Sequence, residues 1–311
     1  MKTVLATTAG LILLCASLFT ATSAQSSGGV SPVTERSNVP LAVSVAPREV
    51  ETGSRITVAG GSGAAQASRV KLQFRDAGTT RWQPVKAVST DGNGRFRTKV
   101  TAERSGALRT AVSTGQVSDV HRIRVRSRLK IKLSSHQVKL GSSMLIRGSV
   151  KPAGRRWIKI AIKGNGRDEI KVRTKAHGGF KVRWKPETSG NFRMRVRSAD
   201  NSIALGDKSR RIKVMGLRPS GASYYGPGLY GNGVACGGTL MPSTMGVAHK
   251  TLPCGTKVTI SYHGRTVTVP VIDRGPYIKG RAWDLTYAAA DALNFLPSGV
   301  DDVRSAVITG K

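Results

Sequence analysis

The sequence predicts an all-β protein in which two tandem β-sandwich domains precede a third, mainly β domain. Short segments such as "IKIAIK" and "FKVRW" alternate apolar with basic residues and are separated by Gly, Asp or Asn turns, the period-two pattern of half-buried strands. Long motifs recur about 88 residues apart. The composition then changes near residue 215. A chain of 311 residues suits two or three domains.

The first 24 residues are typical of a secretory signal peptide. A lysine precedes an apolar run from about Ala9 to Phe19, and small residues lead up to Gln25. The run is shorter than the roughly 20 residues of a membrane span, and Cys15 after "LILL" is a poor match to a lipid-attachment site. We therefore expect an exported protein that does not span a membrane and resides outside the cell or in its envelope. Residues 25–37, rich in Ser and Gly, read as a flexible leader.

Two copies of one domain follow, at residues 38–127 and 128–215. "VETGSRITVAGG" at 50–61 matches "VKLGSSMLIRGS" at 138–149, and "GRFRTKVTAERSGALRTAVS" at 94–113 matches "GFKVRWKPETSGNFRMRVRS" at 179–198. About seven short strands in some 88 residues indicate an immunoglobulin-like or fibronectin-like sandwich.

The positive charge lies mainly in the second copy. The chain carries a formal net charge of +33, and residues 128–214 hold 24 basic and 5 acidic side chains. Such a field attracts polyanions. Because export makes nucleic acid an improbable physiological partner, we expect anionic cell-wall or envelope polymers instead. The alternative is that the lysines and arginines only keep strand edges from aggregating.

Residues 216–311 form the predicted third domain. All six tyrosines lie between Tyr224 and Tyr287. Strand-like runs "KVTISY", "RTVTVPVI" and "SAVI" surround one helical pattern at 286–296, with Thr286 or Asp284 as its N-cap. Residues 262–265, between the first two runs, read as a hairpin turn.

Two cysteines remain after signal removal, Cys236 and Cys254. An even pair in an exported protein predicts a disulfide. A metal site would need more Cys or His at short spacing, and a catalytic thiol would have no use for the second cysteine. We therefore predict no metal and no cofactor.

The third domain resembles the rare lipoprotein A type (RlpA-like) domain over residues 220–308. The blocks "ASYYGPG", "AHKTLPCGT", "DRGP" and "WDL..AAA..L" occur in the family's order. The resemblance implies a six-stranded double-psi β-barrel acting on cell walls. Some relatives are lytic transglycosylases that cut peptidoglycan glycan strands, others are expansin-like proteins that loosen polysaccharides without hydrolysis, and fold alone does not decide between them.

The resemblance also implies candidate catalytic residues. Active members carry a glutamate before the histidine of the "AH" block, and Gly238 stands at that position here. The remaining candidates are Asp284, Asp273 and His249. A lytic transglycosylase needs a single acid, which protonates the glycosidic oxygen and then helps a sugar hydroxyl close onto its own ring. Asp284 is the predicted acid.

Structural roles remain open for the same residues. Asp284 could be only a helix cap, Asp273 could bind backbone N–H groups in its turn, and His249 could be a half-buried histidine without a proton-transfer role. At the N-terminus of a helix, the helix dipole would lower the pKa of Asp284, whereas burial or the charge of Asp273 would raise it.

Aromatic residues are the candidates for holding a sugar chain, because rings stack on sugar faces. We expect Tyr225, Tyr230 and Trp283 to contact the glycan, with Arg274 beside them. Some aromatic residues must instead fill the core. The predicted function is glycan-strand binding, with or without cleavage; the alternative is a non-catalytic, expansin-like or adhesive polysaccharide-binding protein. The sequence predicts no oligomeric state.

Overall fold

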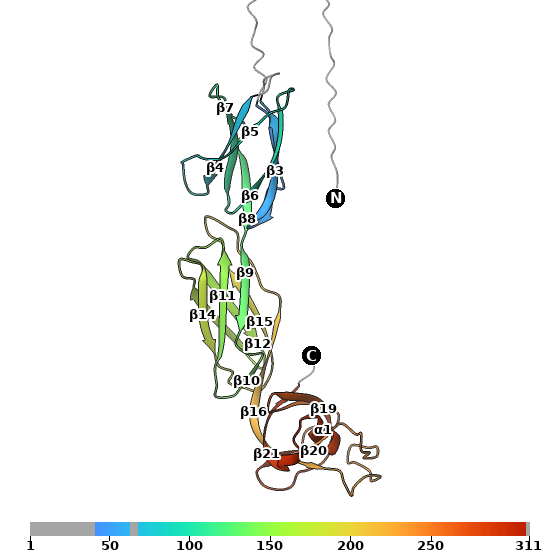
Figure 1. Cartoon of the computed structure of the whole chain (residues 1–311). Coiled ribbons are helices and arrows are strands. Elements are labelled where there is room, and N and C mark those ends of the chain that lie inside the picture. The colour runs from blue at the N-terminus through green and yellow to red at the C-terminus, as the bar shows by residue number, and fades with distance from the viewer. Residues whose placement is uncertain (1–40, 63–67, 309–311) are drawn as a thin grey trace, which may run out of the picture. The chain divides into compact units, whose positions relative to one another are not determined.

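The computed structural model describes residues 41–62 and 68–308, almost entirely as β-strands (Figure 1). The predicted signal peptide (1–24) and leader (25–37) lie outside the described residues. Among the helices of the described ranges, none combines the length and apolar character needed to cross a membrane.

The first sandwich packs a three-stranded sheet, β1-β3-β6, against a five-stranded sheet, β2-β8-β7-β4-β5. Its core contains Ile56, Val58, Leu72 and Ile123 between the sheets. The strands are β1 (Val43–Ala46), β2 (Glu49–Glu51), β3 (Ser54–Gly61), β4 (Arg69–Asp76), β5 (Gln83–Ser89), β6 (Arg95–Ala102), β7 (Gly106–Val112) and β8 (His121–Arg126).

The second sandwich repeats this arrangement. Its small sheet has the order β14-β11-β9, and its large sheet contains β13-β12-β15-β16 with β10 added beside β16. The strands are β9 (Arg128–Leu133), β10 (Gln137–Lys139), β11 (Met144–Lys151), β12 (Trp157–Lys163), β13 (Arg167–Arg173), β14 (Gly179–Trp184), β15 (Gly190–Ser198) and β16 (Ile212–Tyr225).

The internal repeat in the sequence corresponds to this repeated topology. β2 pairs in parallel with β8, and β10 pairs in parallel with β16. Gly53 and Gly141 follow these short strands with φ values of 81° and 88°. Glycine adopts this left-handed conformation without steric cost, which explains why the same residue stands at both turns.

The third domain is a closed six-stranded barrel. Strands β16, β20, β17, β19, β18 and β21 pair in that order, and β21 pairs back onto β16. The new elements are β17 (Val247–Ala248), β18 (Lys257–Tyr262), β19 (Arg265–Asp273), β20 (Arg281–Thr286), α1 (Tyr287–Ala292), a 3-10 turn η1 (Leu296–Ser298) and β21 (Val300–Val307). The predicted fold class, two tandem sandwiches followed by a six-stranded barrel with one short helix, is confirmed.

Strand β16 connects the second sandwich to the barrel. Residues 212–216 pair with β15, and residues 218–225 pair with β20 and β21. The predicted domain boundary at 215/216 therefore falls inside a continuous strand, and the domain boundaries stay predictions.

The helix is shorter than the sequence pattern indicated. It covers Tyr287–Ala292, and Thr286 is its N-cap, with its Oγ1 accepting from Ala289 N. Asp284 lies two residues earlier, inside β20, so the option that it caps the helix is wrong. The predicted hairpin at 262–265 is present: Tyr262 pairs with Arg265 across His263 and Gly264, which have positive φ.

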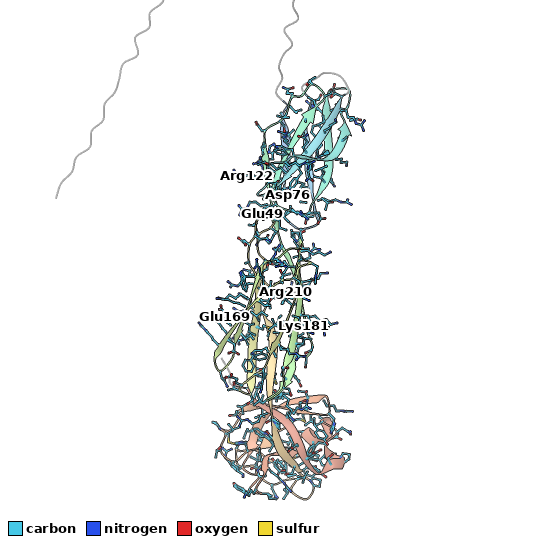
Figure 2. The ribbon with its side chains drawn as sticks, turned by 90° about the vertical axis from the view of Figure 1, so that its left-hand side faces the viewer. Glu49, Asp76, Arg122, Glu169, Lys181 and Arg210 are labelled. Atoms are coloured by element: carbon cyan, nitrogen blue, oxygen red, sulfur yellow. A yellow bond between two sulfur atoms is a disulfide. The ribbon has the colours of Figure 1, made fainter. Side chains whose placement is uncertain are left out.

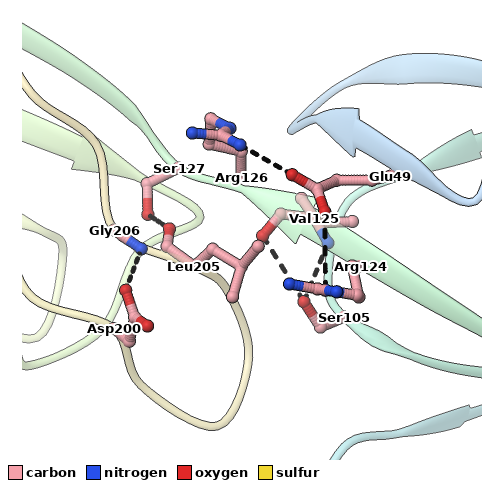
Figure 3. A network of polar contacts seen from close by, with 9 residues as sticks. All are labelled: Glu49, Ser105, Arg124, Val125, Arg126, Ser127, Asp200, Leu205 and Gly206. Atoms are coloured by element: carbon pink, nitrogen blue, oxygen red, sulfur yellow. Dashed lines mark hydrogen bonds and ion pairs between the residues drawn. The ribbon is translucent and has the colours of Figure 1, made fainter.

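Hydrogen bonds join the loop 199–206 to Ser105 just before β7, to β8 and to Ser127 after it, and Figure 3 shows the bond between Ser127 and Leu205. Ser105 N donates to Ile203 O at 2.8 Å, and Leu205 N donates to Val125 O at 2.8 Å. Ser127 Oγ donates to Leu205 O. Close by, Arg126 Nη2 forms an ion pair of 2.6 Å with Glu49.

Candidate functional site

The two aspartates lie in one register row across the barrel wall. Asp273 at the end of β19 pairs with Ala248 of β17, Ala248 pairs with Asp284 of β20, and Asp284 pairs with Ser223 of β16. Two strand spacings separate the aspartates, roughly 10 Å between their Cα atoms. Paired positions project to the same side of a sheet, which brings Ser223 and Asp284 together. A register shift between Val247 and Ala248 interrupts this alternation next to Asp273, but the charges of both aspartates act on the Tyr225 hydroxyl.

Asp284 is half-buried, and burial raises its pKa above the usual value for a carboxyl group. The hydrogen bond from Ser223 Oγ to Asp284 Oδ1, 2.8 Å, and the charge of Arg281 oppose this effect, whereas the charge of Asp273 adds to it. Burial is the largest influence, because the charged form loses hydration there. Burial thus shifts the pKa of Asp284 in the direction that a general acid requires.

Asp273 is anchored by backbone donors. Its Oδ1 accepts hydrogen bonds from Ala235 N at 2.9 Å and from Arg274 N at 2.8 Å. Its carbonyl oxygen accepts from His249 N at 3.1 Å. Asp273 therefore joins the loop before Cys236 to the strand end that carries His249, which is the structural role left open by the sequence.

His249 is held in one neutral form. Thr251 N and Leu252 N both donate to its Nδ1 at 3.1 Å, so the neutral ring carries its proton on Nε2. Burial, followed by the charges of Arg274 and Lys250, lowers the pKa of His249. The ring lies against Trp283, with 4.7 Å between ring centroids. His249 is thus placed to donate a hydrogen bond from Nε2.

Tyr225, at the end of β16, has its hydroxyl under the influence of both aspartates. Burial, then the negative charge of Asp273, the approach of the Asp273 carboxylate to the hydroxyl and the charge of Asp284, raises the pKa of Tyr225 far above its usual value. The hydroxyl oxygen is buried, and its contact with Asp273 falls short of normal hydrogen-bond geometry. Tyr225 therefore stays a neutral hydroxyl close to the carboxylates.

The predicted disulfide between Cys236 and Cys254 is present. Arg274 Nη2 contacts Cys254 Sγ at 3.3 Å, and its Nη1 donates to His249 O at 3.4 Å. Cys236 N donates to Ile272 O. The disulfide and Arg274 together fasten the 226–246 loop next to the aspartates.

Gly238 has a backbone conformation that favours glycine. Its φ is 89°, and that of Gly237 is also 89°. A side chain at this φ is strained, although a Cβ on Gly238 would meet no atom within 4 Å. The loop therefore follows a path suited to glycine at the position where the family resemblance leads us to expect a glutamate.

The expectation that Trp283 contacts a glycan is wrong, because the structure buries it. Only 4% of Trp283 is exposed, and it belongs to the barrel core. Tyr230 is 36% exposed and Tyr277 is 79% exposed. Tyr277 follows Pro276 in the turn after Asp273 and is the more exposed ring, although it was not among the predicted glycan contacts.

Ser223 is the site residue that sequence reasoning missed. It lies 61 positions from Asp284 and meets it only through the parallel pairing of β16 with β20. The sequence signal that could have indicated it is its position two residues before Tyr225, which places both side chains on the same side of a strand. In the described parts of the chain, no group of three or more His, Cys, Asp or Glu side chains could hold a metal ion.

Known proteins resemble this chain in the part that forms the barrel. A family model described as "Lytic transglycolase" covers residues 222–305. The endolytic peptidoglycan transglycosylase RlpA of Campylobacter jejuni is 44% identical over 89 residues, 28% of this chain and 32% of that protein. The protein of the same name from Vibrio cholerae is 41% identical over 107 residues, 33% of this chain and 41% of that protein.

The match thus spans well under half the length of these curated relatives. Among solved structures, a Streptomyces papain inhibitor is 31% identical, with a TM-score of 0.26, over 30% of this chain and 94% of that chain.

Proposed function

We propose, from the premise that residues 222–305 form an RlpA-like double-psi β-barrel, that this domain binds peptidoglycan glycan strands and cleaves them by lytic transglycosylation. The observation that carries the proposal is the half-buried carboxyl of Asp284, whose pKa burial raises, beside Asp273, Tyr225 and Ser223. A glycosidic oxygen is a weak base, so its departure needs an acid that still holds its proton near neutral pH.

The proposed reaction uses Asp284 twice. Its carboxyl proton passes to the glycosidic oxygen as the bond from that oxygen to the anomeric carbon breaks. The resulting carboxylate then takes the proton of the sugar's own 6-hydroxyl as that oxygen bonds to the anomeric carbon. The product is a 1,6-anhydro sugar end, no water is consumed, and Asp284 is again protonated.

Neighbouring groups support these two steps. Ser223 fixes the orientation of the Asp284 carboxyl through its 2.8 Å hydrogen bond. The negative charge of Asp273 helps to keep Asp284 protonated and favours a positively charged, oxocarbenium-like sugar. His249 offers Nε2–H as a donor to the substrate, and Tyr230 and Tyr277 offer exposed rings.

A test is to incubate the protein with purified glycan strands and detect 1,6-anhydro ends by mass spectrometry. Asp284→Asn should abolish these ends while glycan binding persists. Asp291→Asn, which changes an exposed acid on α1, is the matched control and should retain activity. Absence of anhydro ends at high protein concentration would overturn the catalytic part.

A second candidate is a barrel that binds glycan without cleaving it, as expansin-like proteins do. The observation that favours it is Gly238, whose positive φ gives the loop a path unlike that expected for a glutamate. In the same experiment, this candidate predicts strand binding with no anhydro ends from wild type.

We further propose that the protein is exported and that the basic second sandwich holds it against anionic wall polymers. The charge of residues 128–214 supports this part, since solubility needs a net charge of only about 2 to 8 per small domain. The matching test is release of the full chain from wall material as salt rises, because salt screens exposed charges.

A further inference from the structure

One sheet face of the second sandwich carries a dense array of cations, here named the cationic face. Its residues point outward from β13, β12, β15 and the start of β16, as their burial patterns and pairing show, and Arg211 just before β16 is exposed beside them. They are Lys159, Lys163, Arg167, Lys171, Arg173, Arg193, Arg195, Arg197, Arg211 and Lys213.

Like charges stand directly opposite one another on this face. Lys163 pairs with Arg167 on one side and with Arg193 on the other, and Arg193 pairs with Lys213. Opposed like charges destabilise a sheet. Glu169 on the same face forms ion pairs with Lys159 at 2.6 Å and with Lys171 at 3.6 Å. The cations of the face outnumber its acids, so a bound polyanion would lower the repulsion between them.

The face is hollowed where the cations meet. A depression of about 500 Å³ is lined by seven of the cations, including Lys163, Arg167 and Arg195, and by two acids, Asp168 and Glu169, so cations outnumber acids there. Arginine predominates there, and its planar guanidinium offers paired N–H donors to phosphate, sulfate or carboxylate groups. The depression thus presents donors to a chain of anionic groups.

Trp157 adds an apolar surface at one end of this face. It is 56% exposed and pairs with Arg173 across β12 and β13. A second hollow, lined by Trp157, Lys159, Lys171 and Arg197, shares two of these cations with the first. An exposed indole ring beside cations is suited to stack on a sugar face while the charges hold anionic substituents.

We infer that the cationic face is a binding site for an anionic glycan, a linear polymer whose sugar rings carry phosphate, sulfate or carboxylate groups. Trp157 stacks on a sugar ring, and the cations of the depression hold the charged groups of the neighbouring units. This inference deepens the anchoring part of the proposed function by giving the site and the ligand class, and it is independent of cleavage by the barrel.

The geometry favours a glycan over a single-stranded nucleic acid. Proteins that bind single strands stack successive bases on several aromatic side chains. Among the described residues of the cationic face, Trp157 is the single exposed aromatic ring. The face thus has one ring for stacking and many cations, which suits a ligand that is bound mainly through its anionic substituents.

The small sheet of the same sandwich supplies a matched control. Lys132, Arg147 and Lys181 form one exposed row across β9, β11 and β14. Figure 2 shows Lys181 and Glu169 on opposite sides of the sandwich. The test variant combines Lys163→Gln, Arg167→Gln and Arg195→Gln on the cationic face. The control variant replaces Lys132, Arg147 and Lys181 by glutamine. Each variant loses three positive charges, and the control leaves the cationic face unchanged.

The experiment measures binding of the full chain to dextran sulfate, with inorganic polyphosphate, neutral dextran and single-stranded DNA as comparison probes. We expect the triple variant on the cationic face to weaken dextran sulfate binding about tenfold, and the control triple variant by less than about threefold. Trp157→Ala should weaken dextran sulfate about fivefold and leave polyphosphate binding unchanged. Neutral dextran should not bind.

Three results would overturn the inference. Equal losses in the two triple variants would mean attraction by net charge alone. An unchanged affinity in Trp157→Ala would remove the sugar contact, and tighter, Trp157-dependent binding of DNA would identify the ligand as a nucleic acid. The substituted side chains of the two triple variants and Trp157 are exposed, apart from the partly buried Arg195, and circular dichroism of each variant should report unchanged folding. Asp284→Asn should bind dextran sulfate like wild type, which separates this site from the barrel.

Discussion

Ser223 donates a hydrogen bond of 2.8 Å to Asp284 Oδ1 from the adjacent parallel strand. A hydrogen bond to the charged form of a carboxyl group favours that form. Ser223 therefore lowers the pKa of Asp284, while burial, the larger influence, raises it. The protonation of the proposed acid depends on the balance between these two effects.

Replacing Ser223 by alanine should raise the pKa of Asp284 further, because the group that stabilises the carboxylate is lost. Carboxyl ¹³C chemical shifts, measured against pH, would report the change directly. The rate of anhydro-end formation should remain high to a higher pH than in wild type. We expect a stability loss of about 1–2 kcal/mol from the broken hydrogen bond. An unchanged or lowered Asp284 pKa would contradict this account.

Asp284→Asn should raise the free energy of unfolding at neutral pH and change it little at acidic pH. The folded-state pKa of Asp284 lies above its model value of 3.8, so folding disfavours the ionised form. Wild-type stability then falls as pH rises from 3.8 to the folded-state pKa and stays low above it. The amide avoids this loss and keeps an oxygen for Ser223.

Thermal melts of wild type and Asp284→Asn at several pH values would check this. The melting temperature of the variant should exceed that of wild type at pH 7, with the gap closing below pH 3.8. Asp291→Asn, on the exposed surface of α1, should show no such pH-dependent gap. A variant less stable than wild type at pH 7 would mean that the carboxylate is stabilised by its surroundings.

His249 should remain neutral below its usual titration range. Its pKa is lowered from 6.5 by burial and by Arg274 and Lys250, so its contribution to stability is full above 6.5 and is lost as pH falls through the folded-state value. Imidazole ¹⁵N shifts should show the Nε2–H tautomer at pH 7, because Nδ1 accepts from Thr251 and Leu252. An Nδ1–H signal would contradict the structure.

Short residue patterns in the sequence were sufficient to predict many of the strands and turns. The turn at His263-Gly264 is an example, since both residues take positive φ and the flanking runs alternate as strands do. The two sandwiches followed from a repeat that reappears as identical strand order. These features depend on short-range patterns or on self-similarity, and both can be read along one chain.

Which side chains lie next to one another in the candidate site could not be predicted from such patterns. Asp284 seemed close to a helix start, yet it lies in β20, where burial rather than a helix dipole controls its pKa. Trp283 is buried against His249 because alternation along β20 directs it inward. Ser223 meets Asp284 through the register of a long-range parallel pair, which no local pattern specifies.

Tyr225→Phe separates a structural from a chemical role for the hydroxyl. The oxygen is buried without a normal hydrogen bond among the described residues, so its removal should change the unfolding free energy by less than about 1 kcal/mol. Its position near Asp273 and Asp284 means that loss of the hydroxyl should still alter the pH profile of strand cleavage. A large destabilisation with an unchanged pH profile would contradict both expectations.

Removal of the disulfide should destabilise the barrel and loosen the loop that contacts Asp273. Cys236 and Cys254 are 18 positions apart, and opening a loop of that length costs about 3 kcal/mol of unfolding free energy. Ala235 N, next to Cys236, donates to Asp273 Oδ1, so the loop's anchor at the site depends on this link. Cys236→Ser with Cys254→Ser should therefore weaken glycan binding as well as stability.

Hydrogen exchange of the barrel strands is the suitable measurement, because the barrel and the two sandwiches have separate hydrophobic cores and exchange reports on each region separately. Exchange in β18 and β19 should accelerate in the double variant, whereas exchange in β11 and β12 should not change. A reducing agent should reproduce the effect in wild type and add nothing in the double variant. If reduction left barrel exchange and glycan binding unaltered, the disulfide would have no part in holding the loop against Asp273.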